Sequence, residues 1–344
     1  MEQEYKYMVC TKCFTFNQES YIEETLRGFI MQETSFPTVT IVVDDASTDN
    51  TVNVIRTFVE SCFDLQDTSI AYEKETDYAY ITFARHRTNK NCFFAVIYLK
   101  ENHHKQRKPK HPYFKEWTEI AKYTAVCEGD DYWVHPGKLE MQVEFMEAHP
   151  EYIMCHTDFD LTNGGVRNHK VFIDPDDNYF PHTILHGMQI GTLTMLYRNS
   201  DFQKLPHLKS GKGWLMGDLP LIIEMSHEGK IKYFPIVTAK YRILNHSASH
   251  GSIDKEIAFT NSALSIRQFY SKYYGIELPN DGYTKGYFIT MEKYAFKHKN
   301  REIAKEYYNL AKQYNMVSKK LLLFYFAANN QWFGKLVSCV YKSK

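Results

Sequence analysis

The first sixty residues alternate between apolar runs of strand length and stretches with helical spacing. Residues 7–16 (YMVCTKCFTF) and 38–43 (TVTIVV) are predicted as buried strands, because they are short, mostly apolar runs that end at polar turns. Segments 22–30 and 52–59 place apolar residues every three or four positions, as amphipathic helices do. Strand, helix, strand and helix in this order predict an α/β fold with a parallel sheet.

Acidic pairs follow two of the predicted strands. Asp44-Asp45 comes directly after 38–43, and Asp130-Asp131 follows the strand expected at 121–127. Ligands of open parallel sheets bind outside the carboxyl ends of the strands, so we expect both pairs at one crevice. Such carboxylates need a cation or hydrogen-bond donors to stay ionised together, and oxygen ligands suit Mg²⁺ or Mn²⁺ that arrives with phosphates. The pattern indicates a nucleoside diphosphate substrate; the alternative is two solvated turns or helix caps.

Composition and motif searches exclude several other classes. The 41 Lys and Arg residues balance 41 Asp and Glu residues, whereas a general nucleic-acid binder carries a basic excess. The chain has no GxxxxGK[ST] sequence, and the glycines at Gly211, Gly213 and Gly217 have the wrong spacing for a dinucleotide fingerprint. We therefore expect neither ATPase nor nicotinamide chemistry, and no nucleic-acid partner.

Cysteine and histidine residues are assigned structural roles. The seven cysteines are an odd number and imply no disulfide framework, which favours a reduced, intracellular setting. Cys10-x-x-Cys13 lies inside a predicted strand without a second pair, so we expect core cysteines rather than a zinc site. Segment 100–115 is basic and contains two prolines, and it is predicted as an exposed loop with surface histidines.

The pattern changes to helices only from about residue 254. We divide the chain into a domain at 1–250 and a C-terminal helical region at 251–344. The N-terminus lacks a signal-peptide pattern, and the apolar run 321–328 is far shorter than the ~20 residues that span a membrane. These features predict a cytoplasmic location.

The C-terminal region is basic. Residues 301–344 carry a net charge of +6, which leaves −6 on residues 1–300. Apolar and basic residues interleave in WFGKLVSCVYK (332–342), as they do in interfacial helices. This pattern favours a peripheral contact with the inner face of the membrane, and a helix packed on the catalytic domain is the alternative.

Four segments carry recognisable motifs: FTFNQESYIEETLRGFIMQ (14–32), IVVDDASTDNT (41–51), CEGDDYWVHPGKLEMQVEFME (127–147) and WLMGDLPLIIEMSHEGKIKYF (214–234). In this order they resemble the inverting family-2 glycosyltransferases, of the type found in bacterial cell-surface polysaccharide synthesis. The resemblance implies a GT-A fold, which is Rossmann-like with a mainly parallel twisted sheet flanked by helices, here with a C-terminal helical extension.

The resemblance also implies a site for a nucleotide-sugar donor. Asp45 would hydrogen-bond uracil or an equivalent base. Phe14 and Thr15 would line that pocket, and Asn17 would bind the donor beside them. Ala46 stands where the family usually has glycine.

The remaining assignments concern the metal and the chemistry. Asp130 would contact the ribose or the sugar, and Asp131 would ligate the Mn²⁺ or Mg²⁺ that bridges the diphosphate. Glu128 stands at the first position of the DXD motif and would bind the metal indirectly. Asp218 would be the general base that takes the proton of the acceptor hydroxyl; the alternative is a first-turn helix carboxylate.

Two further residues are expected to bind substrate. Trp133 would stack on the acceptor sugar, with core packing as the alternative. Arg242 would contact the diphosphate from a loop.

The sequence thus predicts metal-dependent, inverting transfer of a sugar, most simply from a UDP-sugar, to a saccharide or lipid-linked acceptor. A sugar-phosphate nucleotidyltransferase is an alternative, although the loop at 15–19 lacks the glycines that such enzymes need after the first strand. A non-catalytic carbohydrate-binding protein of the same fold is another.

Overall fold

The computed structural model describes residues 4–162, 176–187, 190–205, 213–244 and 251–341. The chain divides into two compact units, each described here by itself. The first comprises Met1–Tyr179, Met188–Pro206 and Glu224–Ile243, and the second comprises Phe180–Gly187, His207–Ile223 and Leu244–Lys344. The domain boundary at residue 250 stays a prediction.

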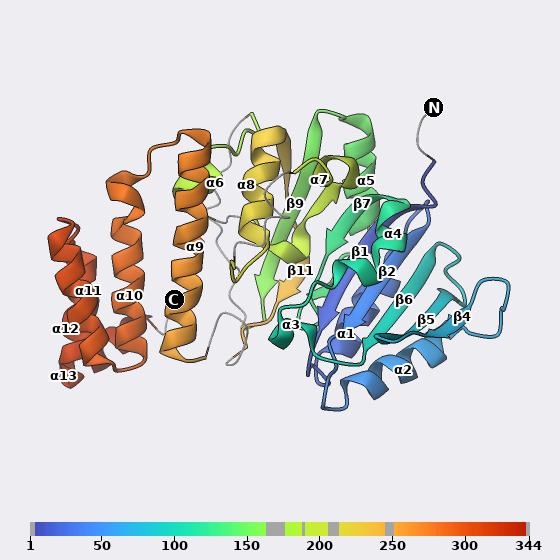
Figure 1. The fold of residues 1–344 in the computed structure, drawn as a ribbon, viewed down its shortest axis with the longest axis horizontal. Helices are drawn as coiled ribbons and strands as arrows, with labels where there is room; N and C mark the ends of the chain where they lie inside the picture. The colour runs from blue at the N-terminus through green and yellow to red at the C-terminus, as the bar shows by residue number, and fades with distance from the viewer. Residues whose placement is uncertain (1–3, 163–175, 188–189, 206–212, 245–250, 342–344) are drawn as a thin grey trace. The chain divides into compact units, whose positions relative to one another are not determined.

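The first unit is built on a mixed sheet with a parallel centre. The central strands run in the order β6 (Cys92–Leu99), β2 (Thr38–Asp44), β1 (Tyr7–Thr15) and β7 (Ala121–Val126), side by side (Figure 1). Further strands extend it on both sides: β3 (Phe63–Asp64), β4 (Tyr72–Glu75) and β5 (Ala79–His86) next to β6, and β10 (Leu196–Arg198), β9 (Tyr152–Leu161), β11 (Lys230–Tyr241) and β8 (Tyr132–Trp133) beyond β7.

Helices cover both faces of this sheet. On one face, apolar side chains of α1 (Ile22–Ile30), α2 (Thr51–Cys62) and α5 (Lys138–Ala148) pack with the strands in one buried cluster. On the other face, a second cluster is closed by Trp117 of α4 (Lys115–Glu119) and by Phe114, the residue before that helix. The amphipathic helices predicted from apolar spacing are therefore confirmed, and so is the expected α/β fold class.

Two predictions of local structure are wrong. Segment 100–115 is mostly exposed, as expected, but it is not a loop throughout, because it forms α3 (His103–Gln106) and a 3₁₀ turn at His111–Tyr113. The strand expected near 190–197 is a 3₁₀ turn at Thr192–Thr194 followed by the short β10. Thr194 is buried and its hydroxyl donates to the Gly191 carbonyl at 2.7 Å, so this threonine closes a turn.

The second unit is helical. Its elements are α6 (His182–His186), the start of α8 (Asp218–Glu228), α9 (Ile253–Tyr274), a 3₁₀ turn at Pro279–Gly282, α10 (Lys285–Lys297), α11 (Arg301–Gln313), α12 (Lys319–Asn329) and α13 (Gln331–Tyr341) (Figure 1). The side chains of Ser252, Thr284, Asn300 and Ser318 each accept a hydrogen bond from a backbone N–H in the first turn of the helix that follows. Such caps satisfy N–H groups that have no partner within the helix.

The expected C-terminal helical extension is thus confirmed. In the part of the chain that the structure describes, no helix has both the length and the apolar character needed to cross a bilayer.

Candidate functional site

The loops that follow β2 and β7 meet at the end of β1. The backbone N–H of Asp45 donates to the Thr15 carbonyl at 2.9 Å, and that of Gly129 donates to the Phe14 carbonyl at 3.0 Å. A Cβ at Gly129 would lie 2.8 Å from the Thr15 Cβ, so only glycine fits where this loop passes β1. The expected convergence of the two acidic pairs follows from this geometry. We call Asp44, Asp45, Glu128, Asp130 and Asp131 the carboxylate edge.

Asp44 shapes the turn after β2. Its carboxylate is buried and accepts hydrogen bonds from the Ser47 backbone N–H at 3.0 Å and the Ser47 hydroxyl at 2.5 Å. Burial raises the pKa of Asp44 above its ordinary value, and the bonds from Ser47 oppose that rise. The turn places Ala46 at a φ of 58°, in the left-handed region that glycine prefers. The Asp44 carboxylate therefore stabilises the turn and is not assigned to ligand binding.

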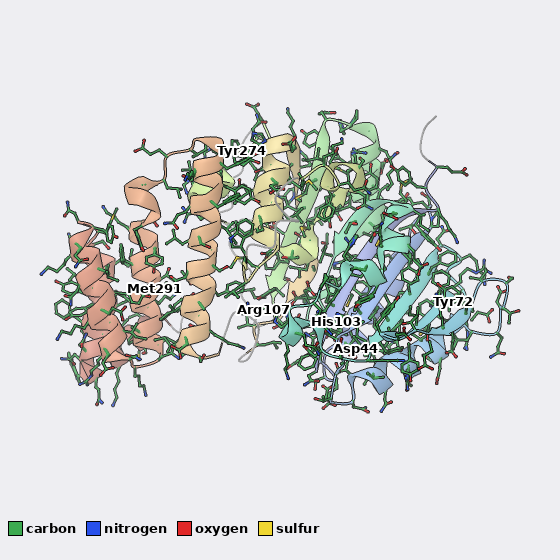
Figure 2. The ribbon with its side chains drawn as sticks, viewed as in Figure 1. Asp44, Tyr72, His103, Arg107, Tyr274 and Met291 are labelled. Carbon is green, nitrogen blue, oxygen red and sulfur yellow. The ribbon has the colours of Figure 1, made fainter. Side chains whose placement is uncertain are left out.

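Asp45 is 2% exposed and faces three donors. Its Oδ1 accepts the backbone N–H of His103 at 2.8 Å, and its Oδ2 accepts that of His104 at 3.0 Å. The ammonium of Lys110 lies 2.9 Å from Oδ2. Asp44 and His103 accordingly lie at the same end of the sheet (Figure 2).

The donors to Asp45 belong to residues 102–114, which we call the basic segment. The Asn102 side chain caps α3 by accepting the Lys105 N–H at 2.8 Å. His103 is fully buried against the ring of Tyr113, at 5.0 Å between ring centroids. The expectation of surface histidines is therefore wrong for His103, because the backbone bonds to Asp45 draw α3 onto the sheet. Asn102, a residue type common at helix caps, was the local signal for this turn.

Phe14 and Thr15 are the pocket residues predicted beside Asp45. Phe14 is half-buried, with its ring centroid 5.8 Å from that of Phe114 and 5.6 Å from the Lys110 ammonium. Thr15 is buried, and its hydroxyl donates to the Gln18 side chain at 2.7 Å. The Lys110 ammonium beside the Phe14 ring makes one side of this region cationic.

Asn17 joins the loops that follow β1 and β2. Its Oδ1 accepts the Thr48 N–H at 2.8 Å, and its own N–H donates to the Ser47 hydroxyl at 2.9 Å. It adopts a φ of 52°, which asparagine tolerates better than most residues. Asn17 thus positions the loop that carries Ala46, and a direct contact with substrate stays a prediction.

The loop after β7 gathers three carboxyl groups. The pKa of Glu128 is raised to about 8, first by burial and then by Asp130 and Asp131. The pKa of Asp131 is also raised to about 8, by burial and by Asp130. Thr25 of α1 holds this loop, since its buried hydroxyl donates to the Asp131 carbonyl at 2.6 Å and lies 3.0 Å from the Gly129 carbonyl oxygen. Thr25 was not predicted as a site residue, because nothing in the sequence distinguishes it from other helix residues.

Arg242 supports the same loop. Its backbone N–H donates to Asp131 Oδ1 at 2.8 Å, and its guanidinium donates to the Asp130 carbonyl at 2.5 Å and to Glu24. The guanidinium lies 4.4 Å from the ring centroid of Tyr132. In this arrangement Arg242 positions Asp130 and Asp131, and its predicted contact with a diphosphate stays a prediction.

The carboxyl groups at the loop after β7 can be tested as ligands for Mn²⁺ or Mg²⁺. Among the described residues, no three His, Cys, Asp or Glu side chains are grouped so as to hold a metal by themselves. Asp131 Oδ1 is used by Arg242, and the described residues place no hydrogen-bond donor on Oδ2. Mg²⁺ commonly takes one or two carboxylates and completes its shell with substrate phosphates and water. The donor set therefore fits an ion that is delivered with a diphosphate.

Trp133 is a core residue, which corrects the expected stacking on an acceptor sugar. Its side chain is 2% exposed, and its indole N–H donates to the Leu193 carbonyl at 2.8 Å. Phe29 packs edge-on at 5.0 Å between ring centroids, and the Lys138 ammonium lies 4.5 Å from the Trp133 ring centroid. The ring has no surface left for a sugar.

Asp218 is the first residue of α8. Its Oδ1 accepts the N–H of Leu219 at 2.8 Å, and Leu219 packs with Ile266 and Tyr270 of α9. Asp218 belongs to the second unit and the carboxylate edge to the first, so its role as general base stays a prediction.

Comparison with known proteins gives matches to parts of this chain. The model of the family described as glycosyl transferase family 2 matches residues 14–106, a stretch that includes Asp45 and ends before Asp130. Uncharacterized proteins of Mycobacterium tuberculosis and Mycobacterium bovis are 36% identical over 143 residues, which is 41% of this chain and 32% of each of theirs. The chain thus matches about a third of the length of these curated relatives.

A solved structure shows a similar fold. The mannosyltransferase PcManGT from Pyrobaculum calidifontis, in complex with GDP-Man and Mn²⁺, gives a TM-score of 0.51 at 12% identity and covers 99% of this chain and 89% of that one. The fold of the chain is accordingly the GT-A fold that the sequence resemblance implied.

Proposed function

We propose that this protein is an inverting glycosyltransferase that moves a sugar from a nucleoside diphosphate sugar, preferentially a UDP-sugar. The observation that carries the proposal is the convergence of Asp45 with Asp130 and Asp131 at the carboxyl end of a parallel sheet. That edge is where α/β folds bind nucleotides. The match of residues 14–106 to glycosyl transferase family 2 supports the same class.

The partners of Asp45 favour uracil or guanine as the base. A carboxylate acceptor and the Lys110 ammonium donor lie 2.9 Å apart. Uracil and guanine both present a ring N–H beside a carbonyl, which complements an acceptor next to a donor. Adenine and cytosine present an unprotonated ring nitrogen beside an amino group, which is the reverse pattern. The half-buried Phe14 ring offers an apolar face to such a base.

Asp131 is the residue we assign to a divalent ion. Among the described residues no hydrogen-bond donor lies on its Oδ2, and the crowded negative charge of Glu128 and Asp130 favours a cation. A bound Mn²⁺ or Mg²⁺ would act as a Lewis acid that neutralises the departing nucleoside diphosphate. Asp130 then contacts the ribose or the sugar, and Arg242 holds both aspartates in place.

Inversion requires a single base at the acceptor. We assign this role to Asp218, which takes the proton of the acceptor hydroxyl while that oxygen attacks the anomeric carbon. The C–O bond to the nucleoside diphosphate breaks as the new glycosidic bond forms, so no covalent enzyme intermediate is needed. We infer that the acceptor is a saccharide or lipid-linked saccharide of a cell-surface polysaccharide, handled in the cytoplasm, because the CEGDDYW segment resembles enzymes of that kind.

The test is release of nucleoside diphosphate from UDP- and GDP-sugars with Mn²⁺ or Mg²⁺. We expect turnover by the unmodified protein, and Asp131→Ala and Asp218→Asn to lower it by about 100-fold or more. Asp77→Asn, at an exposed site, is the matched control and should leave turnover unchanged. Equal turnover in all variants would contradict the assigned roles. Pyrophosphate release from a nucleoside triphosphate and a sugar phosphate would instead show a sugar-phosphate nucleotidyltransferase.

A further inference from the structure

Helix α13 has a fixed orientation on α12. A Cβ at Gly334 would lie 2.7 Å from the Ala327 carbonyl oxygen, which shows how closely the two helices approach. Val337, one turn further along, is 6% exposed and packs with Phe324 and Ala327. Gly334 and Val337 therefore mark the side of α13 that faces α12.

A second side of α13 is apolar and exposed. Trp332, Leu336 and Val340 recur every four residues and are 73%, 48% and 62% exposed. We call these three side chains the α13 stripe. A helix that only covers a core turns its apolar side inward, whereas α13 is apolar on both sides. Exposed tryptophan is uncommon on a surface that faces water alone, and contiguous apolar surface of this kind marks an interaction site.

The charged residues of α12 and α13 all have one sign. Residues 307–344 contain six lysines and no aspartate or glutamate. Lys319 and Lys320 of α12 and Lys335 of α13 are exposed. A partner must therefore present an apolar layer together with negative charge. A second copy of this chain would bring two lysine-rich surfaces together, which like-charge repulsion disfavours.

We propose that the α13 stripe docks on an anionic lipid surface, with α13 lying in the interface between headgroups and acyl chains. Tryptophan suits this depth because its ring is apolar and its N–H reaches the headgroups. Leu336 and Val340 enter the acyl boundary, and the lysines pair with anionic headgroups. This inference goes beyond the proposed sugar transfer and does not depend on it.

Vesicle flotation without donor or acceptor tests the inference. We expect the full chain to float with vesicles of phosphatidylglycerol and phosphatidylcholine and to stay at the bottom with phosphatidylcholine alone. Trp332→Ser with Leu336→Ser should lower the bound fraction at least about fivefold, since most of the inserted apolar area is removed. Lys319→Gln with Lys320→Gln should weaken binding to the anionic vesicles and reduce its sensitivity to salt.

Tyr273→Ser is the matched control, because Tyr273 is a 53% exposed aromatic residue on α9. It should float as the unmodified chain does. Circular dichroism of each variant establishes that its helices are intact. The inference is overturned if the unmodified chain does not float with anionic vesicles, or if the Trp332 and Leu336 double variant floats equally well. It is also overturned if that variant instead abolishes a dimer seen by light scattering.

Discussion

The Lys110 ammonium and the Asp45 carboxylate form an ion pair of 2.9 Å at the carboxyl end of β2. Asp45 is buried and the Lys110 side chain is 19% exposed, so the ammonium lies between the sheet and solvent. It is also close enough to lower the pKa of Glu128 in the neighbouring loop. Lys110 therefore joins the two acidic loops electrostatically.

Replacing Lys110 by methionine should weaken nucleoside diphosphate binding. We expect about a tenfold rise in the dissociation constant of UDP, because one charge-assisted hydrogen bond is lost. Lys108→Met is the control, since Lys108 pairs with Glu101 at the surface. Isothermal titration calorimetry measures both. An unchanged affinity in Lys110→Met would remove Lys110 from the donor site.

Periodicity and motif order predicted most of the parallel sheet and its helices. They did so because buried strands and amphipathic helices are local patterns, as in β1, β2 and α1. The basic segment was expected as a loop, and its short helix was not predicted, because the position of that helix depends on Asp45, more than fifty residues away. Whether Trp133 packs in the core or stacks on a sugar could not be decided from the sequence for a similar reason. The residues that bury it, Phe29 and Leu193, come from distant parts of the chain.

Replacing Ala46 by glycine should stabilise the protein. Ala46 has a φ of 58°, and a non-glycine residue in this region costs about 1–2 kcal/mol. Part of this gain is offset by the greater freedom of glycine in the unfolded chain, so we expect a net increase of about 0.5–1 kcal/mol. Urea unfolding measures it. Ala148→Gly, in the helical conformation of α5, should destabilise instead. Equal effects at the two sites would contradict the strain at Ala46.

Lys138 should make stability depend on pH. It is fully buried, its ammonium donates to Gln142 at 2.7 Å, and burial lowers its pKa to about 8. Between about pH 8 and 10 the unfolded chain holds this proton and the folded chain does not, so the free energy of unfolding rises with pH by up to about 1.4 kcal/mol per unit. Lys138→Met should lack this rise. Urea unfolding at pH 7, 8 and 9 compares the two proteins, and parallel pH profiles would show that Lys138 is not responsible.

Glu292 should give the free energy of unfolding the opposite dependence on pH. It is fully buried in α10, neither carboxyl oxygen has a hydrogen-bond partner among the described residues, and burial raises its pKa to about 8. Between about pH 4.5 and 8 the folded state binds the extra proton, so stability falls as pH rises through this window. Glu292→Met should raise the thermal midpoint, and by more at pH 8 than at pH 5. Glu302→Met, at an exposed site of α11, is the control. A gain that does not vary with pH would contradict the raised pKa.

Calorimetry of nucleoside diphosphates with Mn²⁺ tests the donor site at the carboxylate edge most directly. We predict that UDP binds, that ADP binds at least about tenfold more weakly, and that Asp45→Asn removes the preference, because the amide can donate to the ring nitrogen that the carboxylate repels. Thermal unfolding of Asp45→Asn checks that it is folded. Equal binding of UDP and ADP by the unmodified protein, or UDP binding that Asp45→Asn leaves unchanged, would contradict the assignment of Asp45 to the base.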